Sequence, residues 1–288
     1  MNMITETPVT IFLLARNRPH YLPSTLKSIE SQLYQPWRLL LSDNSTDEAS
    51  AQANEALLEE FRQRNPDHLV RYVRRSGKLS VMDHFHQGLQ EIDTPFVAVH
   101  NDDDIWLPHH LKQLIDWLNQ SEKHGLATSE ALIIDSEGKE TGALLNWTKP
   151  PADSDYKGWL RLSVSNKHSH FGAFPSFVFR TKIAQQVPVI DTDFLVDNLI
   201  LIWYVLCGYY VKGFSEPTIL YRRHDLTLTK TATSLVIERH RLVIWLARHH
   251  FLSVTSKYHN FPLAVLKSFL ALSLKYGVDL QKPEQAEE

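Results

Sequence analysis

The first two-fifths of the chain alternates short apolar runs with longer amphipathic segments, and this alternation most restricts the fold. The run VTIFLLA at 9–15 is apolar apart from Thr10, as is typical of a strand buried on both faces of a parallel sheet. Further strands are predicted at 38–42, 69–73 and 96–100, with helices at 23–32, 47–63, 79–90 and from Pro108 onward. This β-α-β-α order predicts a parallel sheet with helices on both faces.

The pattern changes beyond residue 145. Residues 146–171 are rich in Pro, Asp, Ser, Lys and Trp, which predicts a long loop or insertion. The elements predicted after it are a strand at 174–179, an apolar helix at 194–207 capped by Gly208, short strands at 209–212 and 218–221, and helices at 234–251 and 262–276. We therefore expect a domain over 1–228 and a C-terminal helical extension over 229–288.

Charge and cysteine usage exclude some classes of protein. The chain of 288 residues has 30 Lys+Arg and 33 Asp+Glu, a net charge of −3, which argues against a nucleic-acid binder. The single cysteine, Cys207, excludes an internal disulfide and favours a reducing compartment. No signal-peptide pattern opens the chain, and the longest uncharged apolar run, 199–211, is too short to span a membrane. These features predict a cytoplasmic protein.

Acidic residues directly follow two of the predicted strands. Asp43 follows the strand at 38–42, and the run Asn101-Asp102-Asp103-Asp104 follows the strand at 96–100. In parallel sheets, ligands bind beyond the carboxyl ends of the strands. Adjacent carboxylates repel one another unless a cation compensates them, and carboxylate oxygens suit Mg²⁺ or Mn²⁺. A cation site for a diphosphate is favoured here over a solvated acidic turn.

At these blocks the chain resembles family 2 glycosyltransferases with a GT-A fold. The matching segments are VTIFLLARNRPHYLPSTLKSIESQ at 9–32, LLLSDNSTDEA at 39–49, FVAVHNDDDIWLPHHL at 96–111 and YRRH at 221–224. The resemblance covers most of residues 8–228. It implies an α/β fold of the Rossmann-like nucleotide-diphospho-sugar transferase type, with a mainly parallel sheet and flanking helices, to which the C-terminal helices are added.

The resemblance also implies roles for the strand-end acids. Asp43 falls where the family contacts the base of the nucleotide. Measured back from Pro108, Asp103 is the metal-binding acid of the family's DxD motif. Asn101 stands in place of the motif's usual first acid. This leaves open which neighbouring acid assists Asp103: Asp102, by contacting the nucleotide, or Asp104, by ligating the metal.

Two more residues take a role from the resemblance. Asp197 falls at the position of the general base, with Asp191 and Asp193 as alternatives, and His224 falls at the end of a late motif where it can ligate the metal. A surface imidazole is the alternative for His224.

The chemistry of glycosyl transfer needs such groups. The departing nucleoside diphosphate gains charge, which a Mn²⁺ or Mg²⁺ ion and cationic side chains stabilise. The acceptor hydroxyl loses a proton as it attacks, so a carboxylate must lie within hydrogen-bond reach. In-line attack inverts the anomeric carbon without a covalent intermediate.

Basic and aromatic side chains near the strand ends are further candidates. Arg16 and Arg18 follow the first strand, and Arg74 and Arg75 follow the third; they are expected to meet the nucleotide, or else to lie in solvated turns. Trp106 and Trp159, together with Trp147, are candidates for stacking on acceptor sugars, although simple packing is the commoner role of Trp.

The resemblance implies transfer from a nucleotide-diphosphate sugar, with a UDP sugar favoured, to a hydroxyl of a glycan or lipid-linked acceptor in bacterial polysaccharide synthesis. The alternatives are a catalytically silent nucleotide-sugar- or glycan-binding module and a sugar nucleotidyltransferase, against which the glycine-free segment 15–19 counts. The C-terminal helices are expected to pack on the catalytic domain or in a homodimer. The less favoured alternative is a peripheral contact with anionic lipid at the inner membrane face, made by residues such as Arg241.

Overall fold

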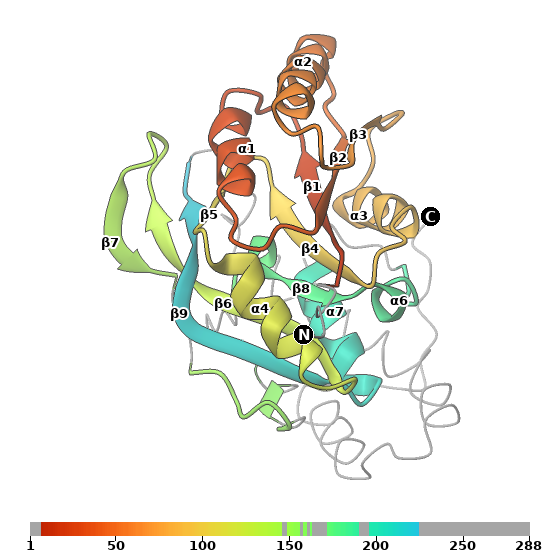
Figure 1. Ribbon diagram of the computed structural model, residues 1–288, viewed down its shortest axis with the longest axis vertical. Helices are drawn as coiled ribbons and strands as arrows, with labels where there is room; N and C mark the ends of the chain where they lie inside the picture. The colour runs from red at the N-terminus through yellow and green to blue at the C-terminus, as the bar shows by residue number, and fades with distance from the viewer. Residues whose placement is uncertain are drawn as a thin grey trace, which may run out of the picture.

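The described strands form one nine-stranded sheet (Figure 1). The computed structural model describes residues 7–145, 149–155, 158–159, 162, 172–189 and 196–224. The strand order is β3-β2-β1-β4-β8-β6-β9-β5, and β7 pairs with β6 outside this path. Of the predicted elements, the helices expected at 234–251 and 262–276 lie outside the described residues, as does the whole of the extension expected at 229–288.

The first half of the sheet is parallel, as the sequence pattern predicts. Its strands are β1 (Val9–Ala15), β2 (Trp37–Asp43), β3 (Val70–Arg74) and β4 (Phe96–Asn101). The helices that connect or follow them are α1 (Leu22–Glu30), α2 (Glu48–Arg64), α3 (Val81–Gln90) and α4 (His110–Asn119). β1 lies at the centre, paired in parallel with both β2 and β4, so the three strands end at one edge.

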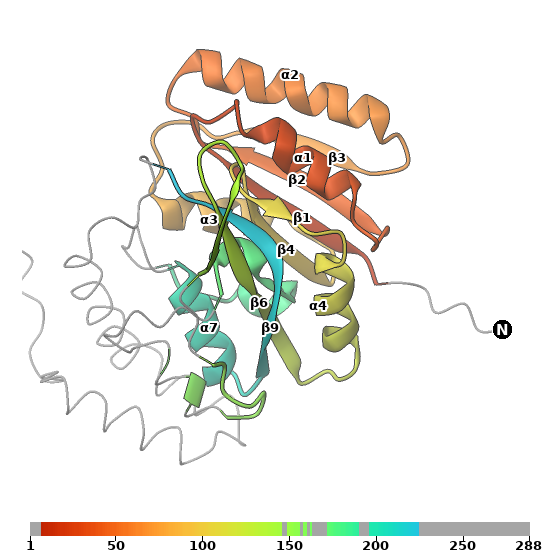
Figure 2. The same cartoon turned by 90° about the vertical axis from the view of Figure 1, so that its left-hand side faces the viewer.

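Helices cover both faces of the sheet because both faces of its strands are apolar. Along β1, Ile11 and Leu13 pack in one core with side chains of α1, α2 and α4, whereas Phe12 packs in a second core with side chains of α3 and α7. Figure 2 shows α1 and α2 on one side of the sheet and α3 and α7 on the other. This alternation is the signature of a two-sided parallel strand.

The second half of the sheet differs from the sequence prediction. The strand expected at 174–179 is a 3-10 turn, Phe174–Ser176, followed by β8 (Val178–Arg180), which pairs antiparallel with both β4 and β6. The two short strands expected at 209–212 and 218–221 are one strand, β9 (Tyr210–Arg222). The sheet also contains three strands that the sequence pattern does not predict: β5 (Ile105–Trp106), β6 (His124–Ile134) and β7 (Glu140–Leu144). The short helix α6 (Thr181–Ala184) follows β8.

β6 escaped prediction because its buried middle is polar. Thr128, Ser129 and Glu130 are each no more than 3% exposed. The Thr128 hydroxyl lies 2.6 Å from that of Ser176, and Ser129 bonds the hydroxyl of Thr218 on β9. These hydroxyls satisfy one another inside the protein, so a polar run that is typical of a loop forms a central strand.

The apolar helix predicted at 194–207 is α7 (Val196–Leu206). Gly208 has a φ of 79°, and the N–H of Tyr209 donates to the carbonyl of Tyr204 at 3.0 Å, so the expected glycine cap is present. Among the described residues, no helix combines the length and hydropathy that a membrane crossing requires.

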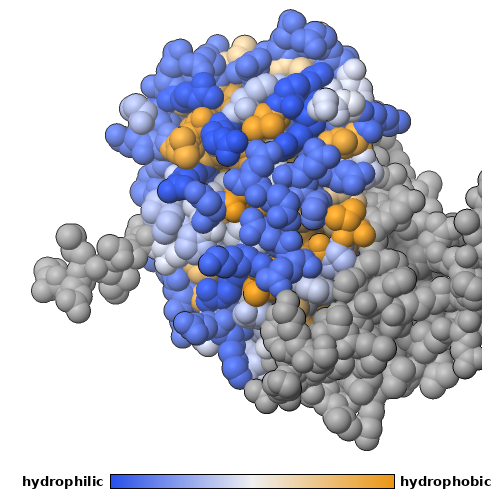
Figure 3. All heavy atoms as spheres, turned by 90° about the vertical axis from the view of Figure 1, so that its right-hand side faces the viewer, coloured by the Kyte–Doolittle hydropathy of each residue, from blue (hydrophilic) through white to orange (hydrophobic). Residues whose placement is uncertain are grey.

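Figure 3 shows a face of the molecule on which hydrophobic side chains form small groups separated by hydrophilic ones. Exposed large hydrophobic residues on the described surface are scattered along the sequence, at Leu33, Leu69, Leu144 and Val189. Single exposed apolar residues of this kind are normal on a globular surface.

Candidate active site at the carboxyl edge of the sheet

Asp43 and the acidic turn Asp102-Asp103-Asp104 lie on either side of β1. In the register of the sheet, Asp43 at the end of β2 is the partner of Ala15, and Asn101 at the end of β4 is the partner of Leu14. Neighbouring strands are about 4.8 Å apart, so roughly 10 Å separates the two backbones at this edge. The expectation that the strand-end acids share one edge is confirmed.

The Asp43 carboxylate is fully buried and bound by protein donors. Its Oδ1 accepts from the N–H of Ser45 at 2.7 Å, and its Oδ2 accepts from the Tyr72 hydroxyl at 2.8 Å and the Asn54 amide at 3.1 Å. Arg74 Nη1 lies 3.7 Å from the same Oδ2. Burial, and then the adjacent carboxylate, raise the pKa of Tyr72 well above its ordinary value, so the hydroxyl keeps the proton it donates.

The loop after β1 is fastened to the loop after β2 through Asn17. Asn17 has a φ of 56°, a left-handed conformation that Asn tolerates better than most residues. Its N–H donates to Ser45 Oγ at 2.9 Å, and its side-chain amide bonds Thr46 twice, at 2.7 and 2.8 Å. The chain between β1 and α1 is thereby held against the Asp43 loop.

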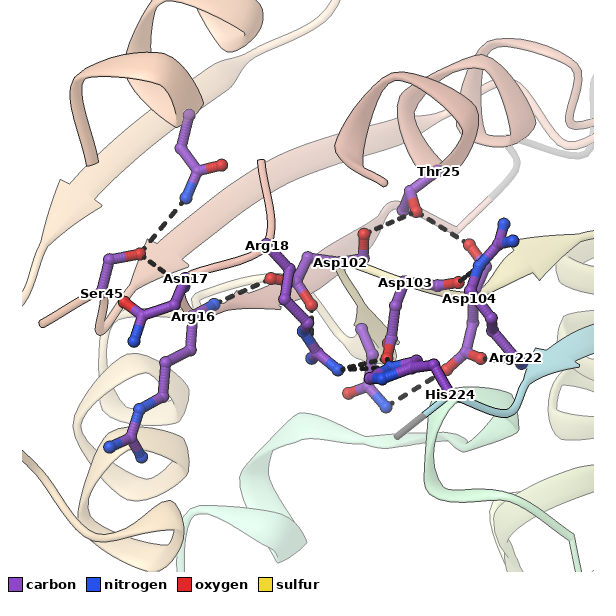
Figure 4. Close-up of polar contacts among 12 residues, drawn as sticks. Arg16, Asn17, Arg18, Thr25, Ser45, Asp102, Asp103, Asp104, Arg222 and His224 are labelled. Atoms are coloured by element: carbon purple, nitrogen blue, oxygen red, sulfur yellow. Dashed lines mark hydrogen bonds and ion pairs between the residues drawn. The ribbon is translucent and has the colours of Figure 1, made fainter. Parts of the chain in front are cut away.

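The turn formed by Asp102, Asp103 and Asp104 is buried and held by donors from the residue after β1 and from α1. The N–H of Arg16 donates to Asp102 Oδ2 at 2.8 Å, and Thr25 Oγ1 donates to the carbonyl of Asp104 at 2.8 Å. The three acids are 0%, 6% and 1% exposed, respectively. Figure 4 shows the three side chains with Arg18, Arg222 and His224 around them.

Both carboxylate oxygens of Asp104 are taken by protein donors. Oδ1 accepts from the N–H of Arg222 at 2.8 Å, and Oδ2 accepts from the Asn101 amide at 3.3 Å. Asn101, which replaces the usual acid of the motif, therefore supports the turn. Since its oxygens are committed in this way, Asp104 fits the role of a structural acid better than the metal role predicted for it.

The end of β9 brings Arg222 and His224 to this turn from far along the chain. Arg222 Nε donates to the carbonyl of Asp103 at 2.7 Å, and its guanidinium lies 4.6 Å from the centre of the Tyr21 ring. His224 Nε2 lies 2.9 Å from Asp103 Oδ2. The predicted proximity of His224 to the acidic turn is therefore present.

Burial is the largest influence on the pKa values of Asp102 and Asp104. It raises the pKa of Asp102 to about 7, against the opposing effect of the Arg18 guanidinium. Burial and the neighbouring Asp103 charge raise the pKa of Asp104 well above its ordinary value. A positive charge near these carboxylates is therefore needed to keep them ionised together.

Arg18 supplies that charge. Its Nη2 pairs with Asp102 Oδ1 at 2.5 Å, and its Nη1 bonds Asp103 Oδ2. Burial lowers the pKa of Arg18, but the carboxylates of Asp102, Asp103 and Asp104 outweigh it and raise that pKa above its ordinary value. The guanidinium is therefore permanently charged.

The other predicted basic residues lie in different surroundings. Arg74 is exposed beside Asp43, and Figure 4 shows the Arg16 side chain extending away from the acidic turn. Arg75 is turned inward: its Nε donates to Ser42 Oγ at 2.7 Å, and its Nη1 pairs with Glu91 at 2.5 Å. Arg75 is thus buried and links β2 to Glu91, the residue that caps the C-terminus of α3.

The two tryptophans predicted to stack on an acceptor are core residues. Trp106 is 1% exposed, is stacked on His100 with ring centres 4.1 Å apart, and donates its indole N–H to the carbonyl of Pro175. Trp159 is 0% exposed and belongs to the core formed with α7. Stacking on a sugar requires an exposed ring face, which neither indole ring has in this structure.

Asp197 is half-buried in the first turn of α7, where its Oδ1 accepts from the N–H of Asn198 at 2.7 Å. The alternatives for the base, Asp191 and Asp193, lie outside the described residues, as does Trp147.

The acidic turn offers part of a ligand set for a divalent ion. Within the described ranges, no three His, Cys, Asp or Glu side chains converge as a metal site. Asp103 and His224 nevertheless bring one carboxylate oxygen and one imidazole nitrogen to the same point. This pair fits two positions of a six-ligand Mn²⁺ or Mg²⁺ set, whose other positions diphosphate oxygens and water would fill.

Several side chains that build the site went unassigned in the sequence analysis. Tyr72 and Asn54 hold Asp43, and Thr25 and Arg222 hold the acidic turn. Thr25 and Arg222 lie in the matched blocks at 9–32 and 221–224, whereas Tyr72 and Asn54 lie outside the matched blocks, in elements where polar residues are ordinary.

Comparison with solved structures supports the fold. S. aureus TarS 1–349 in complex with UDP-GlcNAc has a TM-score of 0.58 at 13% identity, over 96% of this chain and 77% of that chain. The mannosyltransferase PcManGT from Pyrobaculum calidifontis, in complex with GDP-Man and Mn²⁺, has a TM-score of 0.55 at 13% identity, over 96% and 76%. The chain covers 46% of a longer S. aureus TarS structure, with a TM-score of 0.55.

Sequence comparison gives the family. No curated protein matches the chain. The family described as glycosyl transferase family 2 matches residues 10–183, more than half of the chain, and this range contains Asp43 and the acidic turn. The chain belongs to glycosyl transferase family 2.

Proposed function

We propose that this protein is an inverting, metal-dependent glycosyltransferase. It moves a sugar from a nucleotide-diphosphate sugar, favoured to be a UDP sugar, to a hydroxyl of a glycan or lipid-linked acceptor in bacterial surface polysaccharide synthesis. One observation carries the proposal: Asp103 and His224, 121 residues apart in the sequence, are in contact at the carboxyl edge of the sheet. Asp43 lies at the same edge, at the end of β2, and β1 separates β2 from β4, the strand that precedes Asp103.

The nucleotide binds across the end of β1, between Asp43 and the acidic turn. Asp43 holds the base side of the site, either directly or through Tyr72, and Arg74 and Arg16 add positive charge. Complexes of similarly folded proteins with UDP-GlcNAc and GDP-Man support a donor of this class.

The acidic turn serves the leaving group. Asp103 and His224 would hold a Mn²⁺ or Mg²⁺ ion, which when bound would neutralise the charge that develops on the leaving diphosphate. Asp102 orients the loop after β1 by accepting from the N–H of Arg16, and Asp104 fixes the end of β9.

Asp197 takes the proton of the acceptor hydroxyl. A carboxylate in the first turn of a helix is stabilised as an anion by the helix dipole, which keeps it ready to act as a base. Attack by the activated oxygen on the face opposite the leaving diphosphate inverts the anomeric carbon, and no nucleophilic side chain is needed.

A donor screen tests the proposal. Purified protein is incubated with UDP and GDP sugars, and the released nucleoside diphosphate is measured with Mn²⁺ and with EDTA. We expect release from one donor class, loss of release with EDTA, and at least a hundredfold lower rate in Asp103→Asn and Asp197→Asn.

The matched control is Asp116→Asn, because Asp116 lies on an exposed face of α4, where it pairs with Lys112. Equal release with and without EDTA would remove the metal from the proposal. Nucleotide-sugar binding without release from any donor would favour the silent binding module.

A further inference from the structure

The Arg18 guanidinium occupies the place where charge must be supplied to the acidic turn. One of its nitrogens pairs with Asp102 Oδ1 at 2.5 Å, and the other bonds Asp103 Oδ2. The side chain is 21% exposed, so this is a largely desolvated contact in which charge interactions are strong.

His224 reaches the same oxygen atom. Its Nε2 lies 2.9 Å from Asp103 Oδ2 and 3.4 Å from Arg18 Nη1. Mn²⁺ or Mg²⁺ ions bind carboxylate oxygens at about 2.1 Å. An ion held by Asp103 and His224 would therefore take the space that Arg18 Nη1 holds, and its charge would repel the guanidinium.

We propose that Arg18 competes with the divalent cation for Asp103 Oδ2. In the free protein the guanidinium neutralises the buried acids. It leaves Asp103 when metal and nucleoside diphosphate bind. This inference rests on the proposed function for its setting, but it concerns the binding of the metal and not the transfer.

Competition makes metal and diphosphate binding cooperative. The free protein binds the ion weakly, because the ion must first break the pair between Arg18 and Asp103. A diphosphate offers the displaced guanidinium new oxygen acceptors, and Arg binds phosphate well through its planar fork. The diphosphate thus lowers the cost of displacement, and each ligand tightens the binding of the other.

Mn²⁺ binding tests the proposal without turnover. Free Mn²⁺ is counted by electron paramagnetic resonance in titrations of wild type and Arg18→Gln, with and without uridine diphosphate. Without nucleotide, we expect Arg18→Gln to bind Mn²⁺ at least tenfold more tightly than wild type. We expect uridine diphosphate to tighten Mn²⁺ binding at least tenfold in wild type and much less in the variant.

Two controls tie the effect to this contact. Arg71→Gln removes an arginine from an exposed pair with Glu91 and should leave Mn²⁺ affinity unchanged. The double variant Arg18→Gln/Asp103→Asn should lose the gained affinity. Should Arg18→Gln not fold, Arg18→Lys, which keeps the charge but cannot bridge two carboxylates, is measured in its place and should bind Mn²⁺ more tightly than wild type.

Unchanged or weaker Mn²⁺ binding in the folded Arg18 variant overturns the proposal. If wild type also releases nucleoside diphosphate from a donor, the proposed function survives that failure. Conversely, tighter binding in the variant of a protein that turns over no donor supports the competition and rejects the transfer.

Discussion

The backbone N–H of Arg222 donates to the Asp104 carboxylate at 2.8 Å, which fastens the end of β9 to the turn after β4. The Arg222 side chain adds a bond to the carbonyl of Asp103 and two to carbonyls of the turn between β6 and β7. Because His224 follows two residues later, this junction decides whether the imidazole reaches Asp103.

Arg222→Lys should loosen that junction. An ammonium group cannot make the divergent bonds of the guanidinium, and buried carbonyls would lose their donors at a cost of about 2 kcal/mol. We expect lower stability in urea unfolding and at least a tenfold drop in donor turnover. Arg223→Lys, at the exposed neighbouring position, is the control and should change neither; a fully active Arg222→Lys would refute the positioning role.

Asp43→Asn should weaken nucleotide binding. The carboxylate accepts from Ser45, Tyr72 and Asn54, and an amide would turn an N–H₂ group toward at least one of these donors. We expect at least a tenfold weaker affinity for uridine diphosphate by calorimetry. Tyr72→Phe removes one donor and keeps the carboxylate, so its loss should be smaller; equal affinity in folded Asp43→Asn and wild type would exclude Asp43 from the nucleotide site.

The parallel half of the fold followed from the sequence because its signals are local. β1, β2 and β4 each contain a run of buried apolar residues, and residues after a strand necessarily lie at the sheet edge. The placement of Asp43 and Asp103 could therefore be predicted without knowing any tertiary contact.

The rest depended on long-range contacts that no local pattern reports. β6 was missed because Thr128 and Ser129 are satisfied by hydroxyls from distant segments. Arg75 and Trp106 follow strands just as site residues do, yet their partners, Glu91 and Pro175, draw them into the interior. A position after a strand predicts proximity to the edge, whereas the direction of the side chain depends on the partner available.

His84→Gln should change how stability depends on pH. Burial lowers the pKa of His84 to about 4, from an ordinary value of 6.5. As pH falls from 6.5 toward 4, His84 binds a proton in the unfolded chain but stays neutral in the folded protein. The free energy of unfolding of wild type therefore falls by about 1.4 kcal/mol per pH unit because of this group. Gln does not titrate and can still donate to Ser42, which lies against the ring.

The measurement is the difference in unfolding free energy between wild type and His84→Gln, from urea titrations at pH 7 to 4.5. This difference removes the contributions of all other titrating groups that the two proteins share. It should shift in favour of the variant as pH falls below 6.5; a difference independent of pH would show that His84 is not held neutral by burial.

Gly88→Ala should destabilise the packing of α3 on β1. Gly88 is buried, and an added Cβ would overlap the Phe12 ring and lie 3.2 Å from Arg75 Nη2. The helix propensity of Ala favours the substitution by up to about 1 kcal/mol, but overpacking of a core typically costs about 1–3 kcal/mol, and the Phe12 ring is enclosed in the core.

The control is Gln87→Ala, at an exposed position of the same helix. We expect Gly88→Ala to lower the unfolding free energy by about 1–2 kcal/mol in urea titrations, and Gln87→Ala to leave it unchanged or raised. Gly88→Ala as stable as Gln87→Ala would mean that Phe12 can move away, and that the contact between α3 and β1 is looser than the buried ring indicates.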